Sequence, residues 1–320
     1  MVSIIIPTYN RAPLLAFALR SAQGQRYPHT QIIVIDDGST DNTREVVAAF
    51  AGVEYYYQPN RGQAAARNAG LRHCRGDYLA SLDSDDVWEP GFLAESVALL
   101  EQHTLDFVFA NWNVRTSGNG LTRFFAGPGR TRRYCTHALG DWWLLEPAQT
   151  RRLFIETCPA PSSALVLRRA ALVGGWNEQM QIADDWCLLL DVVLSQPRRA
   201  AFTLQPRWTK HVQHDNVYDG RDQLAVIREL GFHDEQLLAK RFRQQLSRRE
   251  RRIFQRRLAQ HYFTYAYLSW QQASPVPVVA RHAARALYLA PLIIAREVAG
   301  GVVNKLRKWL YQPGKLSSEP

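Results

Sequence analysis

The chain has 320 residues, 46% of them hydrophobic and 21% charged, and a formal net charge of +10. This length and composition suffice for one sizeable core, alone or with an appendage. The first residues, MVSIIIPTYN, predict a strand and a turn rather than a secretory leader, because their apolar run is too short for a signal peptide or a membrane span. The four cysteines are Cys74, Cys135, Cys158 and Cys187. They form no CxxC pair and no zinc-binding spacing, so we expect reduced thiols in a cytosolic protein.

Residues 1–115 alternate short β-branched runs with helical patterns. The strand-forming runs lie at 2–7, 31–39, 53–59, 77–83 and 105–114, and the helical patterns at 12–25, 39–50, 62–74 and 90–102. Ser39, Thr40 or Asp41 is expected to cap the second helix. This alternation predicts an α/β fold with a mainly parallel sheet flanked by helices, of the doubly wound nucleotide-binding type.

The pattern is less regular after residue 115. The Gly- and Arg-rich stretch 115–134 predicts a loop, and 162–178 a strand, a short helix and a glycine turn. A helix with acids at its start is expected at 183–196, then a strand at 201–213 and charged helices at 222–260. We therefore expect a catalytic-type domain at 1–220 and a helical C-terminal region at 221–320.

The positive charge lies in the C-terminal part of the chain. Residues 235–320 hold 16 Lys and Arg against 4 Asp and Glu, whereas residues 1–234 hold 23 against 25. Such an asymmetry favours contact between the C-terminal region and an anionic surface.

The segment 286–310 has one apolar face. Its apolar residues recur every three or four positions: Leu292, Ala295, Ala299, Val302, Leu306 and Trp309. A membrane span needs about 20 apolar residues, so this segment is too short to cross a bilayer. Two interpretations remain open: a helix that lies on anionic lipid, with Lys305, Arg307 and Lys308 at the surface, or a helix that packs on the body of the protein.

Four polar motifs follow strands of the predicted sheet: PTYN (7–10), DDGSTD (36–41), RGQAAARNAG (61–70) and DSDD (83–86). Ligands of doubly wound sheets bind outside the carboxyl ends of the strands. The four motifs therefore predict a single site at one edge of one sheet.

The motifs SIIIPTYNR, IIVIDDGSTDNT and NRGQAAARNAGLRHCRGDYLASLDSDDVWEP together resemble the family 2 glycosyltransferases, which have the GT-A fold. The resemblance is dense over residues 1–115 and looser over 155–215. It implies an inverting enzyme that moves a sugar from a UDP-sugar to a hydroxyl acceptor, with Mn²⁺ or Mg²⁺ as cofactor. The acceptor would be a saccharide, a lipid-linked sugar or another hydroxyl compound in cell-surface polysaccharide or glycolipid synthesis.

The resemblance assigns the donor nucleotide to Pro7, Tyr9, Asp37 and Arg67. Tyr9 offers a ring on which uracil can stack, and its alternative is a turn tyrosine without a ligand. Asp37 can accept hydrogen bonds from the base or the ribose, unless the motif only forms a turn. Arg67 carries a guanidinium suited to a diphosphate, and its alternative is a solvated helix arginine.

The DSDD motif matches the DxD motif of the family. Asp85 is the implied ligand of the cation, Asp83 would reach the ribose or the water shell of the metal, and Asp86 would support a neighbouring ligand. Hard oxygen ligands beside a diphosphate suit Mg²⁺ or Mn²⁺. The alternative is a solvated acidic turn.

The stretch ADDW at 183–186 resembles the acidic motif that supplies the general base of the family. The base aligns with Asp185, and Asp184 stands where Glu is commoner. A like-charged neighbour raises one of the two pKa values, as a base requires. The alternative is a pair of acids that only stabilises the start of a helix.

Further candidates are His211 and His214, either of which could contact the metal or the diphosphate or lie on the surface. Residues 159–169 correspond to the region near the acceptor. Trp88 and Trp176 would line sugar pockets or be buried in the core.

Two other functions are alternatives to sugar transfer. A sugar-nucleotide nucleotidyltransferase usually has a Gly-rich loop with Arg or Lys after its first strand, where this chain has PTYNRAP. A nucleic-acid binder would fit the basic C-terminal region, but we expect no exposed aromatic residues interleaved with its basic ones, so no nucleic-acid partner is expected. We expect a cytoplasmic protein, and contact of 286–310 with the inner face of the cell membrane is one of the two open interpretations of that segment.

Overall fold

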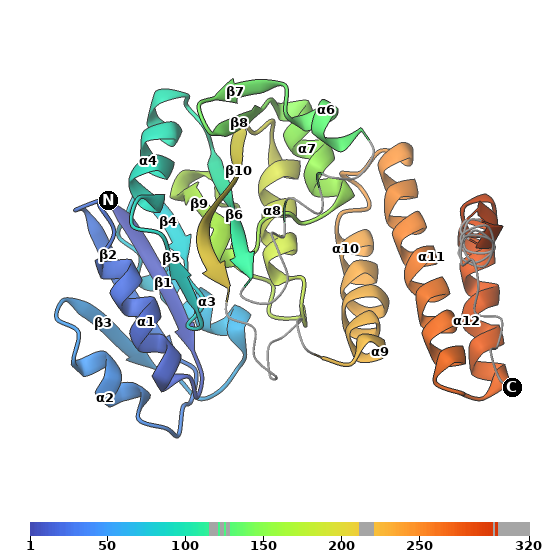
Figure 1. The fold of residues 1–320 in the computed structure, drawn as a ribbon, viewed down its shortest axis with the longest axis horizontal. Coiled ribbons are helices and arrows are strands. Elements are labelled where there is room, and N and C mark those ends of the chain that lie inside the picture. Colours follow the sequence, from blue (N-terminus) through green and yellow to red (C-terminus); the bar gives the residue numbers. More distant parts are fainter. Residues whose placement is uncertain (115–120, 122–124, 126–128, 211–220, 297, 300–320) are drawn as a thin grey trace, which may run out of the picture. The chain divides into compact units, whose positions relative to one another are not determined.

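The computed structural model describes residues 1–114, 121, 125, 129–210, 221–296 and 298–299 (Figure 1). The chain divides into two compact units, Met1–Arg221 and Asp222–Pro320. The division after residue 220 into functional domains stays a prediction.

The first unit is built on a mixed sheet that has ten strands in the described part of the chain, in the order β3-β2-β1-β4-β9-β6-β10-β8-β7, with β5 paired to β10. The strands are β1 (Val2–Thr8), β2 (Thr30–Asp36), β3 (Val53–Tyr57), β4 (Tyr78–Ser81), β5 (Asp86–Trp88), β6 (Phe107–Val114), β7 (His137–Leu139), β8 (Trp142–Leu145), β9 (Leu165–Arg168) and β10 (Ala200–Lys210).

The core strands β3, β2, β1 and β4 are mutually parallel. Strand β9 lies antiparallel between β4 and β6, and β10 runs parallel to β6. All seven residues of β1 are buried, as expected for a β-branched strand covered on both faces. The predicted fold class, a mainly parallel core sheet flanked by helices, is confirmed.

Helices cover this sheet (Figure 1). They are α1 (Ala12–Gln23), α2 (Thr43–Ala48), α3 (Gln63–His73), α4 (Phe92–Gln102), α6 (Arg130–Tyr134), α7 (Pro147–Glu156) and α8 (Asp184–Ser195), with short 3₁₀ turns η1 (Ser162–Ala164) and η2 (Arg169–Ala171). Helix α3 packs closely on β1: a Cβ at Gly70 would lie 2.5 Å from Cγ2 of Ile5. A small residue at this position therefore sets how near α3 comes to the sheet.

Helix α2 begins at Thr43, after Asn42. Of the residues expected to cap it, Asp41 contacts its start, because Oδ1 of Asp41 accepts from the backbone N–H of Thr43 (3.1 Å) while its Oδ2 accepts from the N–H of Ala12 (3.0 Å). Ser39 and Thr40 bind the loop after β1 instead: Ser39 accepts from the N–H of Asn10, and the N–H of Thr40 donates to Oδ1 of Asn10. The short strand β5 was not predicted, and most of the predicted loop 115–134 lies outside the described residues.

The second unit is helical where it is described. It contains α9 (Gln223–Val226), the π-helix η3 (Ile227–Asp234), α10 (Glu235–Arg241), α11 (Arg248–Gln271) and α12 (Val276–Leu289). A capping box of Ser247 and Glu250 starts α11. Small and aliphatic residues join α12 and the chain after it to α11: Ala259, Ala286, Ala290 and Ile294. Across the described ranges, no helix is both long enough and apolar enough to span a bilayer.

Candidate active site

The loops that follow β1 and β2 are bound to each other. The backbone N–H of Asn10 donates to Oγ of Ser39 (2.9 Å), and the N–H of Thr40 donates to Oδ1 of Asn10 (2.8 Å). Pro7 is buried within β1, whereas Tyr9 is 48% exposed at the start of the loop. The ring of Tyr9 is thus held on a braced loop and is open to a stacking partner.

Asp37 lies at the end of β2 and is 4% exposed. Its carboxylate accepts hydrogen bonds from Nε2 of Gln58 (2.6 Å) and from the N–H groups of Arg61 (3.0 Å) and Gly62 (2.7 Å). Gly62 has a φ of 88°, a conformation that favours glycine. Asp37 therefore holds the turn that leads into α3, the helix that carries Arg67.

Arg67 links the two acidic motifs. Its Nη2 lies 2.7 Å from Oδ1 of Asp83, and its Nη1 lies 2.6 Å from Oδ2 of Asp184 and 3.8 Å from Oδ1 of Asp185. Arg67 is 2% exposed. Burial opposes its charge, but the carboxylates of Asp185, Asp83 and Asp184 together raise its pKa above the ordinary value. Residues 67, 83 and 184 thus form one ion-pair network beneath the site.

Ser163 holds the DSDD turn in place. Its hydroxyl oxygen accepts from the N–H of Asp83 (3.0 Å) and donates to Oδ2 of Asp86 (2.7 Å). Its carbonyl accepts from Nε1 of Trp88 (2.7 Å). Ser163 is fully buried, so these bonds fix the turn from below.

Burial and mutual repulsion both disfavour the charged forms of two acids in this turn, Asp85 and Asp86. Burial, followed by the charge of Asp83, raises the pKa of Asp85 to about 6, although Arg11 and Lys210 act in the opposite direction. Burial and the two neighbouring acids also raise the pKa of Asp86 well above its ordinary value. Oδ1 of Asp86 is buried without a hydrogen-bond partner. Such a turn is suited to a cation.

Asp184 and Asp185 begin α8 and have different surroundings. Asp184 is 1% exposed and also accepts from Nε2 of Gln63 (3.0 Å). Burial, followed by the charge of Asp185, raises the pKa of Asp184 to about 7 against the effect of Arg67. The side chain of Asp185 is 19% exposed. The acid with the raised pKa is therefore Asp184, and the acid with access to the surface is Asp185.

Three donors orient the carboxylate of Asp185. Its Oδ2 accepts from the N–H of Ser162 (2.9 Å), and its Oδ1 accepts from the hydroxyl of Ser162 and from Nε1 of Trp176 (3.0 Å). Trp176, expected either in a sugar pocket or in the core, is 4% exposed. Its ring is buried, but its N–H positions a predicted functional carboxylate.

Sequence reasoning did not single out Ser162, Ser163 or Gln63. The only indication in the sequence was the stretch PAPSS at 159–163, whose prolines predict a turn in the region assigned to the acceptor. His211 and His214 lie outside the described residues. Among the residues that the structure describes, no three His, Cys, Asp or Glu side chains gather to hold a metal ion.

Comparison with known proteins identifies the class. The model of glycosyl transferase family 2 matches residues 3–172, so the chain belongs to this family. The putative teichuronic acid biosynthesis glycosyltransferase TuaG of Bacillus subtilis is 31% identical over 134 residues, which cover 40% of this chain and 53% of that protein. The Escherichia coli UDP-Glc:alpha-D-GlcNAc-diphosphoundecaprenol beta-1,3-glucosyltransferase WfgD is 31% identical over 129 residues, 39% of this chain and 51% of that protein. The chain thus spans about half the length of these relatives.

Solved structures show the same fold. The mannosyltransferase PcManGT from Pyrobaculum calidifontis, in complex with GDP-Man and Mn²⁺, has a TM-score of 0.59 at 22% identity, covering 96% of this chain and 82% of that one. Residues 1–349 of Staphylococcus aureus TarS, in complex with UDP-GlcNAc, have a TM-score of 0.58 at 17% identity, covering 93% and 92%. Membership of this family favours sugar transfer over the nucleotidyltransferase considered from the sequence.

Replacing Arg67 by Met tests the buried network. Met has a similar length but no charge, so Asp83 and Asp184 would lose their shared partner. We expect a loss of about 3–5 kcal/mol in the free energy of unfolding, the usual cost of leaving a buried charge unpaired. Urea unfolding at pH 8, followed by tryptophan fluorescence, measures it.

The matched control is Arg61→Met. Arg61 pairs with Glu178, and both side chains are largely exposed, so this change should cost only about 0–1 kcal/mol. Equal losses in the two variants would contradict a special role for the Arg67 network.

Proposed function

We propose that this chain is an inverting glycosyltransferase that moves a sugar from a UDP-sugar to a hydroxyl acceptor in the synthesis of a cell-surface polysaccharide or glycolipid. The observation that carries the proposal is the ion-pair network of Arg67, which ties Asp83 of the DxD motif to the acidic pair Asp184–Asp185. The names of TuaG and WfgD support the acceptor class. In this proposal residues 1–220 form the catalytic domain and 221–320 a basic helical region.

Asp185 is the proposed general base. It would take the proton of the acceptor hydroxyl while that oxygen forms a bond to the anomeric carbon and the bond from this carbon to UDP breaks on the opposite face. The bonds from Ser162 and Trp176 fix the direction of the carboxylate, and its partial exposure lets an acceptor reach it. A general base must first lie within hydrogen-bond reach of the proton that it takes, and an oriented, partly exposed carboxylate can meet this requirement.

The donor would bind along the loops after β1, β2 and β4. Tyr9 would stack on the uracil ring, and Asp83, with its side chain 35% exposed, would meet the ribose. Asp37 already accepts three hydrogen bonds within the chain, so its main contribution to the donor would be to shape the turn before α3. Arg67 would act on the diphosphate through the position it gives Asp83.

The residues of the DSDD turn fit a divalent cation. Burial and the charge of Asp83 raise the pKa of Asp85, and one buried oxygen of Asp86 has no hydrogen-bond partner, so a cation here would favour the charged form of Asp85 and give Asp86 a partner. Asp85 would hold Mn²⁺ or Mg²⁺, with Asp86 supporting a neighbouring ligand. When bound, such an ion neutralises charge on the departing diphosphate.

The proposal places the enzyme in the cytoplasm, at the inner face of the membrane. Within the segment 286–310, Ala286 and Ile294 pack on α11, while Tyr288 and Leu292 are 78% and 77% exposed. The described part of this segment therefore has one side on the protein and another that could enter the lipid interface.

Asp85→Asn tests the cation site. Without its charge the turn should hold Mn²⁺ together with UDP at least about tenfold less tightly, because a charged ligand has been removed. Calorimetric titration of UDP with and without Mn²⁺ measures this. Asp77→Asn is the control, since Asp77 is a largely exposed acid on the first unit. Wild-type affinity in Asp85→Asn would remove Asp85 from the site.

Asp185→Asn tests the base. The amide keeps the shape of the side chain but takes no proton, so transfer should fall by about 10²–10⁴ while UDP still binds. Release of UDP across a panel of UDP-sugars and acceptors, with and without Mn²⁺, is the measurement. Asp191→Asn, on the same helix, is the control. Full transfer by Asp185→Asn would rule out the assigned base.

A double variant, Tyr288→Glu with Leu292→Glu, tests the membrane contact. Charges on these exposed side chains should weaken sedimentation with phosphatidylglycerol vesicles about tenfold or more, since neither residue could enter the lipid. The control is Val276→Glu with Val278→Glu, which adds the same charge at exposed positions outside 286–310. Equal binding by the two double variants would exclude this face as the contact.

A further inference from the structure

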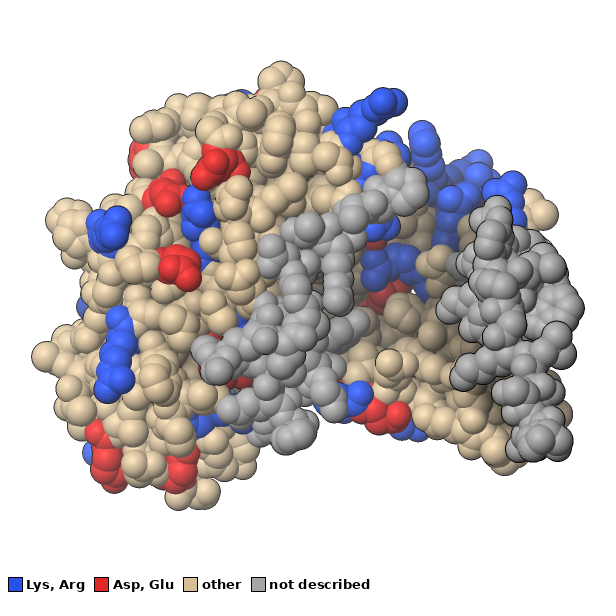
Figure 2. Space-filling model, viewed as in Figure 1, with Lys and Arg blue, Asp and Glu red and all other residues tan. Residues whose placement is uncertain are grey.

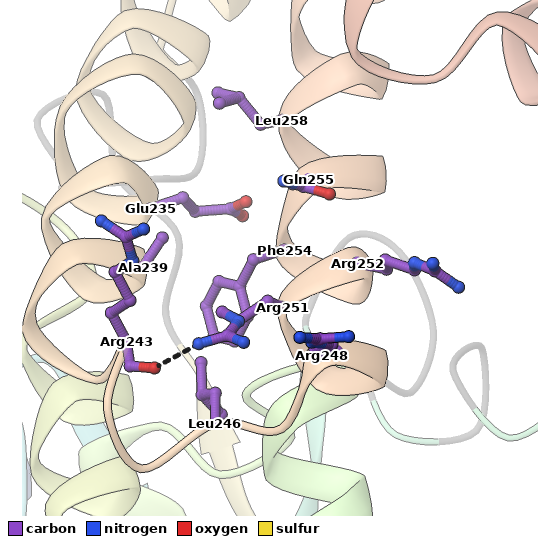
Figure 3. A pocket seen from close by; sticks show the side chains of 10 residues that line it. All are labelled: Glu235, Ala239, Arg243, Leu246, Arg248, Arg251, Arg252, Phe254, Gln255 and Leu258. Carbon is purple, nitrogen blue, oxygen red and sulfur yellow. Dashed lines mark hydrogen bonds between the residues drawn. The ribbon is translucent and has the colours of Figure 1, made fainter.

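A pocket of about 480 Å³ opens between α10, the connection after it and the first turns of α11. Its wall contains four arginines, Arg243, Arg248, Arg251 and Arg252, beside the apolar side chains of Leu246 and Phe254 (Figure 3). All the lining residues belong to the second unit, and Figure 2 shows Lys and Arg gathered over the upper part of α11. Small-molecule sites in proteins have volumes of roughly 300–1,000 Å³.

The arginines are not explained by the stability of α11. Arg248, Arg251 and Arg252 lie in the first two turns of this helix, where the helix dipole favours acids and disfavours cations. None of the four pocket arginines has an ion-pair partner among the described residues, and the one contact that fixes a guanidinium is the bond from Nη1 of Arg251 to the carbonyl of Arg243 (3.1 Å). Four cations that pair with no acid of the described chain, three of them at the helix end that disfavours positive charge, indicate an anionic ligand.

Glu235 in the same wall does not balance these arginines. It is 1% exposed, and its Oε1 accepts from Nη2 of Arg257 (2.6 Å) and Nε2 of His261 (3.0 Å). Burial acts to raise its pKa, but the bonds from His261 and Arg257 outweigh it and leave the pKa lowered. Its charge is therefore matched outside the pocket, while its Oε2 is buried without a hydrogen-bond partner. This oxygen could accept a hydrogen bond from a hydroxyl group.

We propose that the pocket between α10 and α11 binds a phosphate ester that carries a hydroxyl group, with the phosphate on the arginines and the hydroxyl on Glu235. Arginine is suited to phosphate because its guanidinium donates two parallel hydrogen bonds. The buried faces of Leu246 and Phe254 would contact the carbon skeleton. The ester would belong either to a soluble phosphorylated compound or to a lipid headgroup. Its binding does not depend on the proposed sugar transfer, because the donor site lies wholly in the first unit.

Calorimetry of the full chain with sn-glycerol 3-phosphate tests the pocket. EDTA is included, because without a metal the acidic turn of the first unit repels phosphate. We expect saturable binding, weakened about tenfold or more in Arg248→Gln with Arg252→Gln. The matched control, Arg249→Gln with Arg256→Gln, removes two exposed arginines of the same helix that do not line the pocket, and should change the affinity by less than about threefold.

Vesicles distinguish the two sources of the phosphate. If the pocket variant but not the control loses binding to phosphatidylglycerol vesicles, the ester belongs to a lipid headgroup. If only the binding of glycerol 3-phosphate is lost, the ligand is soluble. Absence of binding to both probes, or equal losses in the pocket and control variants, would overturn the proposal.

Glu235→Gln tests the hydroxyl contact separately. The ratio of affinities for glycerol 3-phosphate and inorganic phosphate should fall in this variant, because only the first ligand has hydroxyl groups on carbon that can reach Glu235 while its phosphate lies on the arginines. A general loss of folding would lower both affinities together and leave the ratio unchanged, so circular dichroism and this ratio separate the two effects. An unchanged ratio in a folded variant would remove Glu235 from the contact.

Discussion

The site depends on the burial of Arg67. A guanidinium that is 2% exposed has lost its water, and only carboxylates close by can make that arrangement stable. Asp83 and Asp184 supply them from positions 16 and 117 residues away in the sequence. The same contact that compensates the arginine thus joins the acidic turn after β4 to the start of α8. The ion pairs of Arg67 also offset part of the repulsion between Asp83 and Asp184.

Ser162 and Ser163 provide a second constraint. Adjacent in the sequence, they bond to opposite sides of the site: Ser162 to Asp185, and Ser163 to Asp83 and Asp86. The antiparallel strand β9, which lies between β4 and β6, begins at Leu165, two residues after Ser163. Because β9 pairs with β4, the serines stand next to the turn that β4 leads into. The position of one strand in the sheet therefore fixes the separation of the proposed metal-binding acid and the proposed base.

Two features could be predicted from the sequence: the order of strands and helices in residues 1–115, and the gathering of the motifs at one sheet edge. Both follow from local patterns and from the direction of parallel strands. The contacts of individual side chains could not be predicted from the sequence. Asp37 is predicted to face a nucleotide, and the sequence did not indicate that its carboxylate also accepts three hydrogen bonds from the turn at 58–62. Arg67 is predicted to act on a diphosphate, and the sequence did not indicate that both of its terminal nitrogens bind acids of the chain. Such choices depend on partners far away in the sequence, which periodicity does not reveal.

The acidic pair at the start of α8 shows why a raised pKa alone does not identify a base. Like charges in adjacent positions were expected to raise one pKa, and the raised one is that of Asp184, at about 7. Burial is the largest cause of the raised pKa of Asp184. The carboxylate of Asp184 already binds Arg67 and Gln63, so no acceptor hydroxyl can approach it. Asp185 has the ordered donors and the exposure that proton transfer requires. Asp184 therefore compensates the buried arginine, and the partly exposed Asp185 is the acid of the pair that the proposed acceptor could reach.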